Sequence, residues 1–212
     1  MSHLISQMRE EYETEGIDPA ALGDDPFAVF DEWFRGAHQA GLPQPNAMSL
    51  ATVGDDGFPS VRAVLLKGFD RDGFVFYTNV ASRKGRELDA HPSAAIAFTW
   101  LELHRQVRIE GTATRVSGAE ADEYFATRPR GAQLAASASH QSEPIERREL
   151  LEEAVNELDQ RYPDRVPRPA HWGGYRISPT TFEFWQGRPS RMHDRVLYRR
   201  ADGRWDRTRL SP

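Results

Sequence analysis

Three basic residues at alternate positions near the C-terminus, Arg191, His193 and Arg195, are the first candidates for chemistry. They follow an aromatic pair, Phe184 and Trp185, and a glycine. On an extended chain successive side chains point to opposite faces, so the three basic groups are predicted to share one face. Such a cluster suits an anion, but Arg and His beside Gly and Pro are also common on solvated loops. The spacing alone leaves both interpretations open.

A second basic group opens a predicted short helix. Ser82 is a suitable N-cap, and Arg83 and Lys84 then fall in the first turn, where the helix dipole disfavours cations. Placing them there costs stability unless an anion is bound, and phosphate is attracted both by helix N-termini and by basic side chains. The alternative interpretation is that Arg83 and Lys84 are exposed to solvent, where their position destabilises the helix only slightly and no anion is bound. Arg62 and Thr78, in the neighbouring predicted strands, favour the phosphate site.

Three further features could contact ligands. Tyr124 and Arg128 are four residues apart in a predicted helix and would share a face, which suits a second phosphate or a surface salt bridge. Gln106, at the start of a strand, can donate to and accept from the edge of a heterocycle. Arg9 and Tyr12 have helical spacing in a charged segment, where an exposed arm is the simpler interpretation.

Composition limits the class of protein. The chain has 212 residues, 39% of them hydrophobic, a net charge of −5 and no cysteine. One core is therefore expected: a mobile arm over residues 1–20 and a single domain over residues 21–212. Thiolate metal sites are excluded, and we expect no metal, no nucleic-acid partner and no membrane span. The start lacks a signal-peptide pattern, which predicts a cytoplasmic protein.

The elements needed to position these residues are mainly strands. Asp25 caps a predicted helix whose first residue is Pro26 and whose aromatic stripe is core. Antiparallel strands are expected, joined in part by glycine turns. The expected strands are 47–53, 60–69, 74–79, 94–101, 106–116, 172–177, 181–186 and a hairpin after residue 195. Helices are expected within 118–139 and over 145–162. The fold class is mainly β with helices, a β-barrel plus α.

Eight short motifs occur together in one order. They are VRAVLLKGFD, FVFYTNVASRKG, RQVRIEG, YFATRPRGAQ, HQS, WGGYRI, EFWQG and RMHDR. In this order the chain resembles the pyridoxamine/pyridoxine 5'-phosphate oxidases over nearly its whole length. The resemblance implies an FMN-binding split β-barrel and a homodimer with FMN at the subunit interface. It also implies oxidation of pyridoxine or pyridoxamine 5'-phosphate by O2 to pyridoxal 5'-phosphate, with release of H2O2 and, from the amine, NH3.

The resemblance also implies the site residues. The positions that would bind FMN are Arg62, Ala63, Val64, Leu65, Leu66, Lys67, Tyr77, Thr78, Arg83, Lys84, Gln106, Gln141, Ser142, Trp185 and Arg195. Trp185 and Arg195 would come from the second subunit. The positions that would contact the substrate are Lys67, Tyr124, Arg128, Arg191, Met192, His193, Arg9 and Tyr12.

The chemistry implied is hydride transfer from C4' of the vitamer to N5 of the flavin. The cofactor performs the redox step, so the protein binds the substrate, orients it and tunes the electronic properties of the flavin. Arg195 would stabilise negative charge on the reduced ring. Arg191 and His193 would be the catalytic residues, because they would orient the pyridine so that C4' lies over N5.

Two departures from the family pattern bear on the substrate. Ala132 stands where a serine is usual, and Ala135-Ala136-Ser137 replaces a glycine-alanine-tryptophan run. One hydroxyl donor to the substrate phosphate is therefore missing, which costs about 1.5 to 3 kcal/mol if nothing replaces it. Two alternatives follow: a phenazine-pathway-like flavin oxidase of an unphosphorylated ring, or a non-catalytic protein that binds FMN or pyridoxal phosphate.

Overall fold

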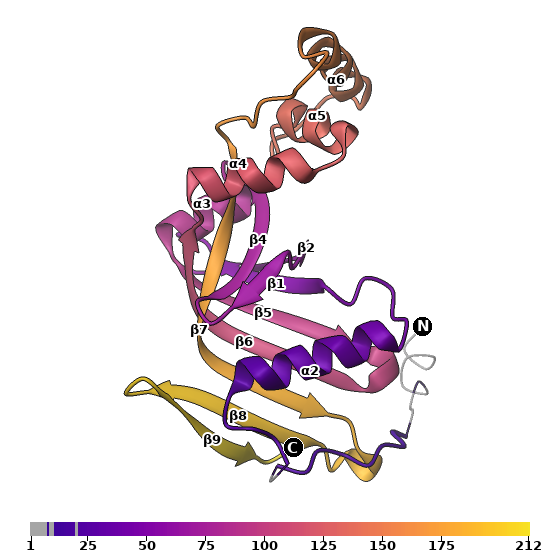
Figure 1. The fold of residues 1–212 in the computed structure, drawn as a ribbon, viewed down its shortest axis with the longest axis vertical. Coiled ribbons are helices and arrows are strands. Elements are labelled where there is room, and N and C mark those ends of the chain that lie inside the picture. Colours follow the sequence, from indigo (N-terminus) through magenta and orange to yellow (C-terminus); the bar gives the residue numbers. More distant parts are fainter. Residues whose placement is uncertain (1–7, 9–10, 20) are drawn as a thin grey trace. The chain divides into compact units, whose positions relative to one another are not determined.

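A computed structural model describes residue 8, residues 11–19 and residues 21–212. The described residues form two compact units. The first unit comprises those within Met1–Ser49, Ala95–Glu110 and Pro179–Pro212, and the second comprises Leu50–Ala94 and Gly111–Ser178. Figure 1 labels the helices and strands. Arg9 lies outside the described residues, and residues 11–18 form neither helix nor strand.

The helices and strands follow the predicted order. The α-helices are α2 (Pro26–Gln39), α3 (Arg83–Ala90), α4 (Gly118–Thr127), α5 (Arg130–Ala138) and α6 (Glu149–Arg161). The strands are β1 (Ala47–Val53), β2 (Pro59–Leu65), β3 (Gly68–Asp70), β4 (Gly73–Asn79), β5 (Ser93–Trp100), β6 (Arg105–Arg115), β7 (Trp172–Gln186), β8 (Asp194–Ala201) and β9 (Arg204–Leu210). Two short 3-10 helices are η1 (Leu101–Leu103) and η2 (Pro189–Arg191).

One nine-stranded sheet connects these strands in the described part of the chain. Its order is β2-β1-β5-β6-β7-β4-β3, with β8 paired to β7 and β9 paired to β8. The pairs β3–β4, β4–β7, β7–β8 and β8–β9 are antiparallel. The predicted class, mainly β with helices, is confirmed.

The first unit packs α2 against the sheet through aromatic rings. Asp25 caps this helix as predicted, since its carboxylate accepts from the backbone N–H of Phe27 at 3.1 Å. The ring of Phe30, which is fully buried, lies 5.0 Å from that of Phe98, and Trp33 lies 5.3 Å from Phe184. Helical spacing therefore places the aromatic stripe in the core, where each ring buries a large apolar area.

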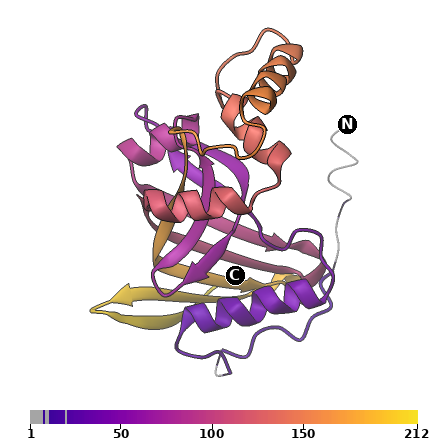
Figure 2. The same ribbon diagram turned by 45° about the horizontal axis from the view of Figure 1, so that its top comes forward.

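The second unit carries α3, α4, α5 and α6, and the last two lie side by side in Figures 1 and 2. The helix α3 approaches the end of β4 so closely that a Cβ added at Gly85 would lie 2.1 Å from the carbonyl oxygen of Val80. The hydroxyl of Tyr175 donates to the Gly85 carbonyl at 3.0 Å. Only glycine fits here, and this contact fixes the position of the neighbouring Lys84.

The predicted strand 60–69 is wrong as a single element. The chain forms β2, leaves the strand at Leu66 and Lys67, and then forms β3, which pairs with β4 rather than with β1. The Lys67 amide donates to the Val75 carbonyl at 2.8 Å. Strict alternation from Arg62 to Lys67 therefore does not hold, because the strand changes partner between them.

The two predicted strands 172–177 and 181–186 are one strand, β7. Trp172–Ile177 pairs with β4 and Thr181–Gln186 pairs with β8, so one side of β7 changes partner around Pro179. A proline has no N–H to donate, and at this point neither of those partners requires one. The helix predicted over 145–162 is also shorter, since α6 begins at Glu149.

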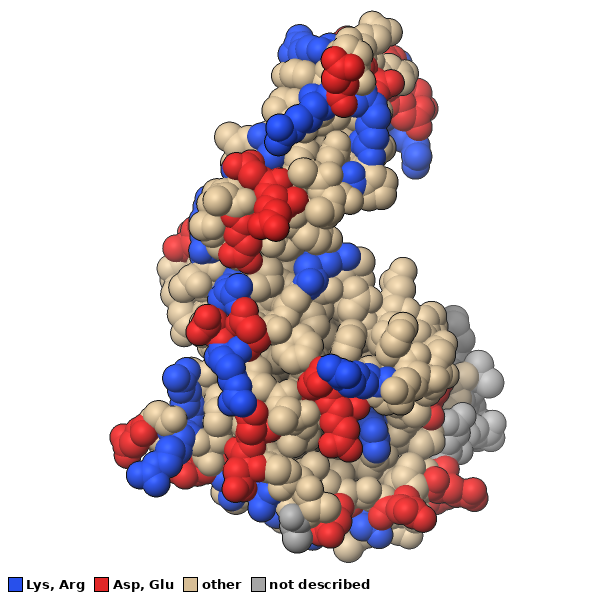
Figure 3. Space-filling view, in the orientation of Figure 1, with Lys and Arg blue, Asp and Glu red and all other residues tan. Residues whose placement is uncertain are grey.

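Acidic and basic side chains are interspersed on the face shown in Figure 3. This mixture agrees with a net charge of −5 that is not gathered into one broad field. Among the described helices, none has the length and apolar character that a membrane crossing requires.

Candidate functional site

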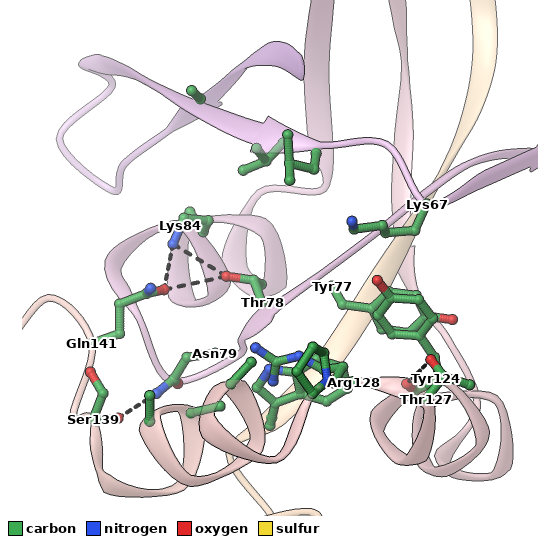
Figure 4. Close-up of a pocket in the computed structure, with 18 of the residues that line it drawn as sticks. Lys67, Tyr77, Thr78, Asn79, Lys84, Tyr124, Thr127, Arg128, Ser139 and Gln141 are labelled. Carbon is green, nitrogen blue, oxygen red and sulfur yellow. Dashed lines mark hydrogen bonds between the residues drawn. The ribbon is translucent and has the colours of Figure 1, made fainter. Parts of the chain in front are cut away.

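A cavity of about 750 Å³ lies within the second unit (Figure 4). Strand β4 and helices α3, α4 and α5 supply most of its walls, together with the end of β2. Ten predicted site residues line it: Ala63, Val64, Leu65, Lys67, Tyr77, Thr78, Lys84, Tyr124, Arg128 and Gln141. The structure thus collects predicted cofactor and substrate residues at one cavity.

Lys84 and its partners form one side of the cavity. Its Nζ donates to Gln141 Oε1 at 2.7 Å, to Ser82 Oγ at 3.1 Å and to Thr78 Oγ1 at 3.3 Å. The α3 N-terminus is capped from outside, because the Arg83 amide donates to Ser142 Oγ at 3.1 Å while Ser82 makes no side-chain cap. The N-terminus of α3, the ammonium of Lys84 and the neighbouring hydroxyls together favour the binding of a phosphate.

Burial changes the titration of this lysine. Desolvation, followed by the positive charge of Arg62, lowers the pKa of Lys84 to about 8, while the charge of Glu87 acts in the opposite direction. Each hydrogen-bond partner of the ammonium is a neutral oxygen. A bound anion would compensate this buried charge, since opposite charge favours the ionised form.

Arg62 and Arg83 both contact one buried carboxylate, Glu87. Glu87 accepts from Arg62 Nη2 at 3.2 Å and from Arg83 Nε at 2.7 Å. It also accepts from Thr52 at 2.5 Å and from Ser60 at 2.7 Å. Burial alone would raise the pKa of Glu87, but these four hydrogen bonds lower it to about 2. Glu87 is therefore ionised, and the sequence analysis missed it.

Aromatic rings form another part of the cavity. The rings of Tyr77 and Tyr124 are stacked with centroids 4.0 Å apart, and the Trp172 ring lies parallel to Tyr77 at 5.4 Å. Burial and the charge of Glu120 raise the pKa of Tyr77 to about 12, so its hydroxyl is neutral. Lys67 lines the same cavity as these tyrosines (Figure 4).

Arg128 does not share a helical face with Tyr124 as predicted. The helix α4 ends at Thr127, and Arg128 is its C-cap with an extended backbone (ψ 146°). The guanidinium instead lies over Trp172, 4.9 Å from the ring centroid, and its Nη1 is buried without a hydrogen-bond partner. Burial lowers the pKa of Arg128. A buried charged donor that lacks a partner is suited to an anionic ligand.

The wall formed by α5 is built from small side chains. Ala132, Ala135 and Ala136 line the cavity, and Leu151 of α6 lines it as well. The departures at Ala132, Ala135 and Ala136 therefore lie at the cavity itself, and the alanine at 132 removes a hydroxyl donor from its wall. Ser137, which stands in place of the tryptophan, does not line the cavity and donates to the Gln133 carbonyl at 2.9 Å.

The predicted alternation of Arg191, His193 and Arg195 is wrong. Residues 189–191 form the 3-10 helix η2, Arg191 has a positive φ of 59°, and β8 begins only at Asp194. A proline and left-handed residues turn the chain here, so strand periodicity does not apply. Met192 is 68% exposed.

Tyr12 joins a ring cluster in the first unit, formed with His104, Trp185 and His193. Its ring centroid lies 4.5 Å from His104, 5.6 Å from His193 and 6.1 Å from Trp185. A Cβ added at Gly187 would lie 2.8 Å from the Tyr12 ring and 3.0 Å from His104. His104 and Gly187 were not predicted, because neither has a spacing that signals a ring contact.

Arg195 is held by a carboxylate that the sequence analysis missed. Its Nε donates to Glu183 at 2.8 Å, and Glu183 also accepts from Arg108. Arg195 and Trp185 are directly paired across β7 and β8. Gln106 donates to Thr99 Oγ1 at 3.3 Å. These three predicted cofactor residues all belong to the first unit.

Four predicted residues of the second unit do not line the cavity: Arg62, Leu66, Arg83 and Ser142. Leu66 is buried, and the other three belong to the hydrogen-bonded network around α3. No group of His, Cys, Asp or Glu among the described residues is arranged to hold a metal ion.

Comparison with known proteins decides the family. Residues 34–162 match the family described as pyridoxamine 5'-phosphate oxidase, and residues 172–212 match a pyridoxine 5'-phosphate oxidase C-terminal dimerisation region. The chain belongs to the pyridoxamine 5'-phosphate oxidase family. A pyridoxine/pyridoxamine 5'-phosphate oxidase from Burkholderia lata is 54% identical and covers 98% of this chain and 99% of the relative. One from Rubrobacter xylanophilus is 56% identical over 98% of this chain and 96% of the relative.

Solved structures of the oxidase family and its neighbours confirm the split-barrel fold. PhzG from Burkholderia lata 383, solved with tetrahydrophenazine-1-carboxylic acid, has a TM-score of 0.89 and 32% identity, and covers 95% of this chain and 100% of its own. An FMN-binding protein from Nostoc punctiforme has a TM-score of 0.73 at 20% identity and covers 90% of this chain and 100% of its own. The family assignment supports FMN as the cofactor, as the resemblance predicted.

Proposed function

We propose that this oxidase converts pyridoxine 5'-phosphate, pyridoxamine 5'-phosphate or both to pyridoxal 5'-phosphate, with FMN as cofactor and O2 as acceptor. One observation carries the proposal. The same cavity presents two sets of phosphate-binding groups, one centred on Lys84 and the other formed by Lys67, Tyr124 and Arg128. A phosphorylated cofactor and a phosphorylated substrate together require two such sets.

The residues of the cavity fit FMN. Lys84, Thr78, Gln141 and the α3 N-terminus would hold the phosphate, and the apolar end of β2 would contact the ring. The buried ammonium with only neutral partners is the observation that favours an anion here. When bound, FMN would accept hydride from C4' of the substrate and pass the electrons to O2, giving H2O2.

The chain's own residues bind and orient the substrate. The unpartnered Nη1 of Arg128, the ammonium of Lys67 and the hydroxyl of Tyr124 would hold the substrate phosphate. Arg191 and His193 would fix the pyridine ring so that C4' faces the flavin, which is a positional contribution. Met192 and Tyr12 would also contact the substrate, and Arg9 is assigned by resemblance alone.

We also propose a homodimer with FMN at its interface. Support comes from the match of residues 172–212 to a dimerisation region. Trp185 and Arg195 would then complete the flavin site from the second subunit, with Arg195 beside the charge that develops on the reduced ring. Gln106 would contact the flavin as well. Analytical ultracentrifugation should give twice the mass of 24.1 kDa, and a monomer that retains FMN would contradict the arrangement.

Anaerobic reduction tests the activity. The purified protein should be yellow, and pyridoxine 5'-phosphate or pyridoxamine 5'-phosphate added without O2 should bleach the flavin absorbance. Readmitting O2 should restore the colour and yield pyridoxal 5'-phosphate and H2O2. Bound FMN that neither vitamer bleaches would instead indicate a protein that only binds its ligands.

An oxidase of an unphosphorylated ring is the second candidate. The small α5 wall at Ala132, Ala135 and Ala136 favours it, because a wider cavity lacking one hydroxyl donor suits a larger ring without phosphate. The structural similarity to PhzG points in the same direction. Bleaching by a dihydrophenazine carboxylate, with none by the B6 phosphates, would establish this candidate.

A further inference from the structure

Glu87 occupies an unusual position for a carboxylate. It is 7% exposed, lies on α3 one turn after Arg83, and accepts hydrogen bonds from both guanidiniums that the resemblance assigns to FMN. A carboxylate beside a phosphate site repels the ligand unless neighbouring cations offset its charge. The contacts of Glu87 with Arg62 and Arg83 provide such cations.

The carboxylate engages one part of each guanidinium. Arg83 is bound through Nε, and no hydrogen bond joins its terminal Nη atoms to another described residue. The side chain of Arg83 is 58% exposed, so those atoms remain accessible to a ligand. Arg62 is held by more contacts: Nη2 donates to Glu87 and Ser60, and Nη1 donates to Thr52 and to the Leu50 carbonyl, so its terminal N–H groups are engaged within the protein. Fixed in this way, a guanidinium loses less conformational entropy when an anion binds.

The cations around Glu87 carry more charge than this carboxylate, by an amount that matches a phosphate. Arg62, Arg83 and Lys84 provide three cations against the single charge of Glu87, which leaves two positive charges in excess. A phosphate monoester carries close to two negative charges at neutral pH. The nearby Asp55 and Asp56 are exposed and are engaged elsewhere, with His91 and with the Phe58 amide.

We propose that Glu87 is a positioning residue for the cofactor phosphate: it fixes Arg62 within the protein and holds Arg83 through Nε, so that the terminal Nη atoms of Arg83 face the phosphate of FMN beside Lys84. The inference rests on the proposed function, since it concerns the same flavin site. Glu87 touches neither cofactor nor substrate in this scheme. It acts through the two arginines, and its effect should therefore depend on whether the ligand carries a phosphate.

Riboflavin, which lacks the phosphate, is the probe that isolates this effect. Binding of FMN and riboflavin to the apoprotein should be measured by quenching of flavin fluorescence for the wild type and for Glu87→Gln. We expect the Kd for FMN to rise about tenfold and the Kd for riboflavin to change less than about twofold, a difference that corresponds to the loss of one oriented charged contact. Unchanged or tighter FMN binding would overturn the inference.

Asp89→Asn is the matched control. Asp89 lies on the same helix, forms an ion pair with Arg115 and accepts from the Tyr175 hydroxyl, and it makes no hydrogen bond to Arg62 or Arg83. The substitution should therefore leave both Kd values unchanged. If Glu87→Gln weakened FMN and riboflavin equally, Glu87 would merely support the fold and the inference would fail. Ser60→Ala, which removes one hydroxyl from Glu87, should reproduce the selective loss more weakly, at about threefold. It provides the test if Glu87→Gln does not fold.

The pH dependence of FMN binding adds a second readout. The negative charge of Glu87 raises the pKa of Lys84, against burial and the charge of Arg62. Glu87→Gln should therefore shift the alkaline loss of FMN affinity to lower pH, whereas Asp89→Asn should not. An unshifted profile would contradict the inference. A wild-type protein that binds neither flavin would overturn the proposed function itself.

Discussion

Lys84 Nζ lies 2.7 Å from Oε1 of Gln141, and 57 residues separate the two in sequence. The contact joins the first turn of α3 to the loop that follows α5. Because Gln141 is neutral, it can orient the ammonium without cancelling its charge. The pair therefore presents a charged donor that is already positioned when the ligand arrives.

FMN affinity should fall above about pH 8. In the absence of ligand the pKa of Lys84 is about 8, lowered by burial and by Arg62, and only the protonated form attracts phosphate. Below this pKa the amine is charged and binding is strong. Above it, binding must also take up a proton, so the Kd should rise with pH. Fluorescence titrations between pH 6 and about 10 would measure the change.

Lys84→Met is the control for this pH dependence. It should bind FMN more weakly near neutral pH, by about tenfold or more, and should lose the alkaline decline, because the titrating group is gone. A wild-type profile that stayed flat above pH 8, or a variant that kept the decline, would show that another group is responsible.

Restoring a hydroxyl on α5 should tighten substrate binding. Ala132→Ser places a donor on the cavity wall, and a hydrogen bond to a charged group contributes about 1.5 to 3 kcal/mol at most. We expect the KM for pyridoxine 5'-phosphate to fall by about tenfold, which corresponds to the lower end of this range, with little change in kcat. Steady-state kinetics would measure this.

Ala138→Ser supplies the comparison for that variant. Ala138 lies on the same helix but does not line the cavity, so its substitution should leave KM unchanged. A higher KM in Ala132→Ser would favour the alternative of a larger, unphosphorylated ring.

Local sequence signals identified most elements because each depends on near neighbours. Asp25 and Pro26 define a helix start, and the glycine turns define hairpins, so α2, β1, β8 and β9 were predictable. The continuity of β7 through Pro179 was not, because it depends on which strands pair on each side. The break at Lys67 has the same cause.

Within the site, motif residues were predictable and their supporting groups were not. Lys84 and Arg128 belong to motifs that resemble a known family. Glu87, Glu183 and His104 became visible only through tertiary contacts, since a charged residue in sequence is more often solvated than buried. The failed alternation at Arg191 has a different cause, because the positive φ there depends on the turn geometry.

Gly187→Ala should disturb the arm without affecting the flavin phosphate. The added Cβ would lie 2.8 Å from the Tyr12 ring, so Tyr12 must move away from His193 and Trp185. If Tyr12 contacts the substrate as proposed, KM should rise about threefold to tenfold, while the Kd for FMN stays within about twofold. Gly23→Ala, where a Cβ meets nothing within 4 Å, should change neither KM nor the Kd for FMN. An unchanged KM in Gly187→Ala would argue against a role for Tyr12 in substrate binding.

Arg191→Ala should lower turnover far more than FMN content. Arg191 lies on η2, outside the strand, and is exposed, so its loss should not disturb the core. A misplaced substrate reacts slowly even when the flavin is intact, and misplacement by about 1 Å can cost about a hundredfold in rate. We therefore expect kcat/KM to fall by about that factor while the ratio of flavin to protein absorbance is unchanged. Arg200→Ala, an exposed arginine of β8, should retain both. Because Arg191 is assigned to the substrate ring and not to the cofactor, equal losses of turnover and FMN in Arg191→Ala would contradict that division.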